Sequence, residues 1–167
     1  MGGSALMQIK GIILYSYSGK RRIVPFNPGK VNIITGDSGK GKSALISIVD
    51  YCLGSSKFNV PAGIISDAVA WFGLHLVFDS SELFVARENP GKSQQSTNKA
   101  YIEESRTIQI PEQAPEEANS TIDAVETAIG SKLGIVKYDE SDNDIQSSAS
   151  LRLALPYCIQ ELSLIHI

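Results

Sequence analysis

The stretch VNIITGDSGKGKSALISIVDYCLG, residues 31–54, decides the fold of this chain. Its central segment, residues 36–43, fits the pattern G-x-x-x-x-G-K-[ST], in which successive backbone N–H groups of a glycine-rich loop surround phosphate groups. The β-branched run before it, residues 31–35, predicts a buried strand. The residues after it predict a helix, and a strand, a glycine-rich loop and a helix in that order form a phosphate-binding unit.

The helix after the loop is predicted from the spacing of its apolar residues, which recur at three and four positions: Leu45, Ile48, Val49, Cys52 and Leu53. We expect Gly54 to end it. The start of such a helix carries about half a positive charge and unpaired N–H donors, both of which favour a phosphate.

The eight residues of the loop are the candidate cofactor-binding residues: Gly36, Asp37, Ser38, Gly39, Lys40, Gly41, Lys42 and Ser43. Glycine permits the positive φ and the close backbone approach that such a loop needs. We expect Lys42 to act as a catalytic residue on the β- and γ-phosphates, and the Ser43 hydroxyl to ligate Mg²⁺. An adventitious surface loop is the alternative, and the flanking strand and helix favour nucleotide binding.

Upstream of the loop, two further β-like runs cover residues 9–16 and 21–26. Turn residues at 18–19 and 27–29 separate them from each other and from the third run, which predicts an antiparallel pair that leads into a buried strand. Tyr15, Tyr17 and the basic cluster at residues 20–22 are candidates to approach the base and phosphates of a nucleotide. A solvated basic hairpin is the favoured interpretation of these residues.

Downstream, residues 69–78 and 82–87 flank a short polar turn and predict a β-hairpin with a well-buried face. His75 lies on its opposite face, where no carboxylate, cysteine or second histidine is in register, so we expect a packed or surface histidine. Residues 89–119 form a polar and acidic loop insertion, expected to be mostly solvated. A helix capped at Ser120 should follow and end near residue 130 or 134.

Composition sets limits on the class of protein. The chain has 167 residues, 43% hydrophobic and 20% charged, which is typical of one soluble domain. The net charge of −3 gives no support to bulk attraction to nucleic acid or to an anionic membrane, although residues 1–42 hold seven Lys or Arg and one Asp. No window approaches the roughly 20 apolar residues of a membrane span, so we expect no membrane partner and a cytoplasmic protein. Cys52 and Cys158 lie in apolar runs and should be buried.

A family resemblance follows from the residues around the loop. The segments MQIKGIILYS, residues 7–16, and PGKVNIITGDSGKGKSALISIVDYCLG, residues 28–54, resemble the N-terminal lobe of the ATPase head in the SMC, RecN and SbcC (Rad-fifty-like) class of coiled-coil ATPases. They are most similar to uncharacterised bacterial SMC-like ATPases of mobile-element or phage-defence gene clusters. The resemblance covers residues 7–88 well. It implies an α/β P-loop NTPase fold with an antiparallel β-hairpin subdomain, and assigns residues 7–161 to that lobe.

The resemblance also implies cofactors, partners and one further site residue. ATP and Mg²⁺ would be bound, and the full-length protein would hydrolyse ATP to drive engagement of two heads in a homodimer, with DNA a candidate partner through regions outside this chain. Gln160 stands where the class uses a glutamine, as a catalytic residue and metal ligand, to touch Mg²⁺ and the attacking water. A surface glutamine that caps an apolar run is the alternative, and both stay open.

Two features of the class are missing from this sequence: an apolar strand that ends in Asp-Glu, and a Ser-Gly-Gly signature. We therefore expect the front third or less of a larger protein, inactive in hydrolysis by itself. Residues 162–167 match the translation of a sequencing adapter and are not expected to be native. A small-molecule kinase and a non-hydrolysing nucleotide-binding interaction module are the alternative functions; the first would need an arginine-rich lid, for which residues 55–135 offer only Arg87 and Arg106.

Overall fold

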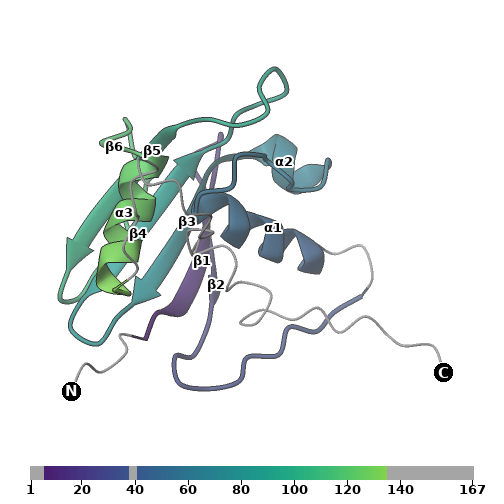
Figure 1. The fold of residues 1–167 in the computed structure, drawn as a ribbon. Helices are drawn as coiled ribbons and strands as arrows, with labels where there is room; N and C mark the ends of the chain where they lie inside the picture. The colour runs from purple at the N-terminus through teal and green to yellow at the C-terminus, as the bar shows by residue number, and fades with distance from the viewer. Residues whose placement is uncertain (1–5, 38–40, 135–167) are drawn as a thin grey trace, which may run out of the picture.

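A six-stranded antiparallel sheet forms the centre of the protein, as seen in a computed structural model that describes residues 6–37 and 41–134 (Figure 1). The strand order is β2-β1-β3-β4-β5-β6. The strands are β1 (Gln8–Ser16), β2 (Arg21–Pro25), β3 (Val69–Val77), β4 (Glu82–Glu88), β5 (Lys99–Ser105) and β6 (Ser120–Thr121). The helices of the described residues are α1 (Lys42–Cys52), α2 (Ile64–Ala68) and α3 (Ile122–Lys132). The expected mixed α/β class is therefore correct.

Two apolar clusters, one on each face of the sheet, hold the fold together. On one face, residues such as Ile12, Phe72 and Leu74 pack with buried residues of α1 and α3. On the other, Ile13, Trp71 and Phe84 belong to a smaller cluster. Because neighbouring residues of a strand point to opposite faces, β1 and β3 contribute to both clusters and are buried on both sides. The predicted hairpin at residues 69–87 is confirmed as β3 and β4, and the predicted pair upstream as β1 and β2.

Helices α1 and α3 cover the same face of the sheet. Helix α1 has the predicted apolar stripe and stops as expected: its C-cap is Leu53, and Gly54 follows with φ 115°. A Cβ at Gly54 would lie 1.7 Å from Oε1 of Glu126 in α3, so the two helices approach closely at this point. Helix α3 starts one residue later than predicted, since the Thr121 side chain accepts the capping hydrogen bond from the Ala124 N–H.

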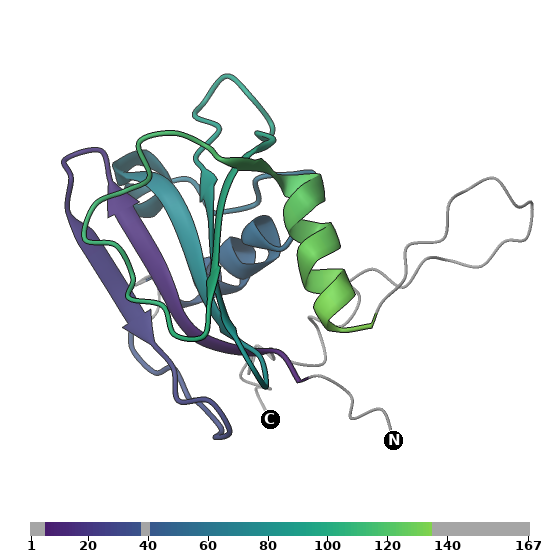
Figure 2. The same ribbon diagram turned by 90° about the vertical axis from the view of Figure 1, so that its left-hand side faces the viewer.

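The segment of residues 106–118 crosses the other face of the sheet (Figure 2). Ile108 is buried there, and the Pro111 carbonyl accepts a 2.8 Å hydrogen bond from the Tyr15 hydroxyl. Arg21 donates to the Ile110 carbonyl at 2.6 Å. The predicted loop insertion at residues 89–119 is wrong for residues 99–105, which form strand β5 because they pair along their length with β4. Residues 106–118 are mostly exposed or half-buried, as expected, but Ile108 is buried because it covers apolar sheet surface that water would otherwise reach. We call residues 106–118 the covering segment.

The buried strand predicted at residues 31–35 is not formed. This run has no strand assignment, and Val31, Ile33 and Ile34 are 90%, 75% and 44% exposed. A strand needs a neighbour to satisfy its backbone N–H and C=O groups, and within residues 6–37 and 41–134 no strand pairs with this run. The turn before it is formed as predicted, with Asn32 closing it through hydrogen bonds to Asn27 and Lys30.

Among residues 6–37 and 41–134, no helix combines the length and the apolar character that crossing a bilayer requires.

Candidate phosphate-binding site

The glycine-rich loop leads directly into helix α1. Gly41 is the N-cap of that helix, with φ 87° in the left-handed region, and Gly36 has φ 150°. Side chains other than glycine rarely adopt either conformation, so the two ends of the motif use glycine for the reason that the pattern predicts. Residues 38–40, which include Ser38, Gly39 and Lys40, lie outside the described residues.

Lys42 joins the two ends of the loop. Its ammonium donates to the carbonyl of Gly36 at 2.5 Å and to the carbonyl of Asp37 at 2.6 Å. An ammonium group has three N–H donors, so one donor is left beyond these two carbonyls. The side chain thus holds the first residues of the motif against the start of the helix and keeps a positive charge at that position.

The N-terminus of α1 has the polarity of an anion site. The helix has eleven residues, no side-chain hydrogen bond at its N-cap and no acidic residue in its first turn. Its first N–H groups have no acceptor within the helix, and the helix dipole adds partial positive charge at the same end. Ser43 is exposed in this first turn, next to Lys42. Gly36, Asp37, Gly41, Lys42 and Ser43 are therefore brought together, as the motif predicts.

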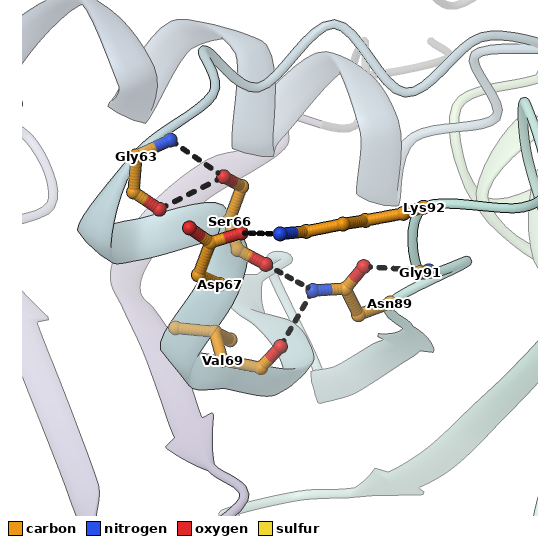
Figure 3. Close-up of polar contacts among 7 residues, drawn as sticks. All are labelled: Gly63, Ser66, Asp67, Val69, Asn89, Gly91 and Lys92. Carbon is orange, nitrogen blue, oxygen red and sulfur yellow. Dashed lines mark hydrogen bonds and ion pairs between the residues drawn. The ribbon is translucent and has the colours of Figure 1, made fainter.

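Helix α2 lies beside the end of the loop, which sequence analysis did not predict. A Cβ at Gly41 would lie 2.8 Å from Cδ1 of Ile65 in α2, so only glycine fits against this helix without displacement. The start of α2 is fixed by Ser66, whose Oγ accepts from the Gly63 N–H and donates to the Gly63 carbonyl, both at 2.9 Å (Figure 3).

Asn89 fixes the other end of α2. Its side-chain amide donates to the carbonyls of Ser66 at 2.8 Å and Val69 at 2.6 Å, and its Oδ1 accepts from the Gly91 N–H at 2.9 Å (Figure 3). Asn89 is buried, so these contacts replace the water that its amide would otherwise bind. The only signal in the sequence is the Asn-Pro-Gly turn at residues 89–91, which predicts a loop but not its partner.

Arg87 holds the opposite end of α1. Its buried guanidinium donates to the carbonyls of Tyr51 at 2.6 Å and Ser55 at 2.7 Å, and to the Thr97 carbonyl and the Ser96 hydroxyl in the loop after β4. The same group lies 4.0 Å from the centre of the Tyr51 ring. A cation at the C-terminus of a helix is favoured by the helix dipole. The end of α1 far from the phosphate-binding loop is thereby tied to β4 and to residues 96–97.

Of the upstream residues considered for a nucleotide site, Tyr15 and Arg21 have other partners. Tyr15 is buried under the covering segment, and burial raises the pKa of its hydroxyl to about 12. Arg21 pairs with Glu112 at 2.7 Å, so it does not extend toward the loop and is not the solvated residue expected in a basic hairpin. Tyr17 is exposed, and its backbone N–H donates to the Ala68 carbonyl at the end of α2.

Of the candidate metal ligands, Ser43 lies in the described part of the chain and Gln160 does not. Gln160 lies outside the described residues, as do Cys158 and residues 162–167. Among the residues that the structure describes, no group of three or more His, Cys, Asp or Glu could hold a metal ion. His75 is packed, as expected, but a carboxylate does face it: Oε2 of Glu82, from the next strand, lies 2.8 Å from Nε2. Ser43 is then the one described candidate Mg²⁺ ligand of the motif.

Comparison with known proteins yields no match, either to a protein-family model or to a curated protein. The candidate site therefore depends on its own geometry and on the motif.

Proposed function

We propose that residues 36–43 bind the phosphates of ATP together with Mg²⁺, in the N-terminal lobe of an SMC-like ATPase head. One observation carries the proposal: Lys42 bonds to both carbonyls at the start of the loop, Gly36 and Asp37. The motif requires this lysine to stay at the loop, and the contacts keep its charge next to the uncapped start of α1.

Each residue of the loop has a defined part in the proposal. The remaining N–H donor of Lys42 and the first N–H groups of α1 would bind phosphate oxygens, since charge-assisted hydrogen bonds to an anion are the stronger kind. The Ser43 hydroxyl would be a ligand of Mg²⁺, which neutralises charge on the phosphates when bound. Gly36 and Gly41 would let the backbone approach the phosphates closely.

Binding and hydrolysis have different requirements in this proposal. Positioning and electrostatic stabilisation supply most of the catalysis in phosphoryl transfer, and they need acids that hold Mg²⁺ and orient water. The sequence has no apolar strand that ends in Asp-Glu. We therefore propose that this chain binds Mg-ATP without turning it over, and that hydrolysis requires further parts of a longer protein.

Calorimetric titration of the 167-residue chain with Mg-ATP tests the proposal. Lys42→Ala should weaken binding at least about tenfold, which corresponds to about 1.4 kcal/mol. Lys30→Ala is the matched control: it removes an exposed lysine of the same basic segment outside the motif, and should change the affinity less than about twofold. Equal affinity for the wild type and Lys42→Ala would overturn the proposal. Lys42-dependent hydrolysis at rates typical of enzymes would overturn the separation of binding from turnover.

A further inference from the structure

A cavity lies on the sheet face opposite α1, where the covering segment ends. Its volume is about 300 Å³, and its lining residues are Trp71, Glu88, Lys99, Glu116, Glu117 and Ala118. Trp71 lies directly opposite Glu88 in the register of β3 and β4, so their side chains share this face. The cavity is therefore built on the sheet and closed on one side by the covering segment.

The charge of the lining is negative. Three glutamates and one lysine line the cavity, and the lysine is already paired, with 3.2 Å between the Lys99 ammonium and Oε2 of Glu88. Glu116 and Glu117 take part in no hydrogen bond or ion pair with any residue in the described ranges. Two carboxylates next to each other thus face the cavity without a cation.

Trp71 adds a hydrogen-bond donor of its own. Its side chain is almost fully enclosed, with 7% of the residue exposed, and its indole N–H has no partner among the described residues. In the same part of the chain, every fully buried polar side-chain atom does have a partner, so the indole nitrogen must be open to solvent. Trp71 lines the cavity on the same face of the sheet as Glu88, so this side chain and its unpartnered donor lie beside any ligand bound there.

We propose that this cavity binds a basic segment of a partner protein. An arginine side chain would lie between the carboxylates of Glu116 and Glu117, while a backbone carbonyl of the same peptide accepts a hydrogen bond from the indole N–H of Trp71. The planar guanidinium, with five N–H donors, suits several carboxylates at once. A volume of about 300 Å³ is at the lower limit for ligand pockets, which fits one long side chain better than a larger molecule.

The donor at Trp71 distinguishes a peptide from a free polyamine. Both carry cations that suit the glutamates, but a polyamine offers no carbonyl to the indole N–H, whereas every peptide unit does. The site lies on the opposite face of the sheet from α1, so the inference does not depend on nucleotide binding.

The single tryptophan of the chain gives a direct test. The ¹⁵N-labelled chain should show one indole N–H signal, which is followed during titration with acetyl-Gly-Arg-Gly-amide. Saturable movement of this signal to lower field is expected, because the proton gains an acceptor. The same peptide with citrulline in place of arginine, which has no charge, should bind at least about tenfold more weakly.

Two variants and one competitor complete the experiment. The double variant Glu116→Gln, Glu117→Gln should weaken binding at least about tenfold, and Glu112→Gln, in the same segment but paired with Arg21, should change it less than about twofold. These positions are exposed, so the folded state is expected to persist, as the amide spectrum can verify. The proposal is overturned if the arginine peptide does not saturate, if the double variant binds as well as the wild type, or if spermidine moves the indole signal in the same way.

Discussion

Glu82 is a buried carboxylate at which a single change should reveal a large electrostatic contribution to stability. Its buried carboxylate accepts hydrogen bonds from Lys10 at 2.8 Å, from His75 at 2.8 Å and from the Ile108 N–H at 2.8 Å. Burial alone would raise the pKa of this carboxyl, but the three hydrogen bonds outweigh burial and lower the pKa from 4.5 to about 2. The ionised form is therefore favoured in the folded state.

The lowered pKa of Glu82 gives both the sign and the size of its contribution to the free energy of unfolding. Because the folded pKa is below the unfolded value, the contribution is fully present above pH 4.5 and is lost as the pH falls toward 2. At about 1.4 kcal/mol for each pH unit, the upper bound is about 3 kcal/mol. We expect Glu82→Gln to reduce the free energy of unfolding by about 2–3 kcal/mol at pH 7, and by less than half of that at about pH 3.

Urea unfolding of the wild type and two variants between pH 7 and pH 3 measures this difference. Glu112→Gln is the control, since Glu112 also pairs with a cation but its side chain is 81% exposed, and such pairs contribute about 0–1 kcal/mol. Hydrogen exchange at the Ile108 amide should accelerate in Glu82→Gln, because that N–H loses an ionised acceptor. A loss that is independent of pH, or no larger than that of Glu112→Gln, would refute the reasoning.

Two substitutions and one labelling experiment test the packing of the core and of α1. Gly54→Ala should lower the free energy of unfolding in urea by about 2–4 kcal/mol, because alanine is strained at φ 115° and its Cβ would clash with Glu126. Adding Glu126→Ala should restore only the part of this loss that comes from the clash. Full restoration of the stability would argue against strain at φ 115°. Arg87→Lys should cost about 3–4 kcal/mol because a lysine cannot reach all its carbonyl partners, while the exposed Arg22→Lys should stay within about 0.5 kcal/mol; equal losses would contradict the buried role. Cys52 is fully buried, which raises its thiol pKa to about 12, so iodoacetamide at pH 8 should leave it unmodified until denaturant is added, as peptide mass spectrometry can show; rapid labelling of the folded chain would disprove its burial.

Local patterns in the sequence were sufficient to predict the helices and strands that form within a short stretch of chain. Helix α1, the β3–β4 hairpin and helix α3 each bury an apolar face whose period is visible in the sequence. The same is true of the loop ends, where glycine at 36 and 41 is required by φ. At these positions the backbone conformation itself requires glycine, so the residue type was enough to predict it.

The run at residues 31–35 shows where such patterns fail. Its β-branched residues favour a strand, but a strand is stable only beside a partner, and partner choice depends on residues far away in the sequence. Asn89 and Arg87 were missed for a related reason: their partners, in α2 and at the end of α1, lie more than twenty residues upstream. A polar residue next to a turn is compatible with many partners, and only the fold selects one.

The covering segment also determines the order in which the protein can fold. Its hydrogen bonds to Tyr15 and Arg21 join residues 96 and 89 positions apart in the sequence, whereas the β3–β4 hairpin pairs near neighbours. Closing such long loops costs entropy before any contact compensates for it, so local pairs form early and these contacts late. A chain in which β1–β4 and α1 have formed before this segment packs on the sheet would leave Trp71 and Phe84 open to water. Such a species would be prone to associate through that face, and a chain emerging from the ribosome would pass through it until residue 118 had been made.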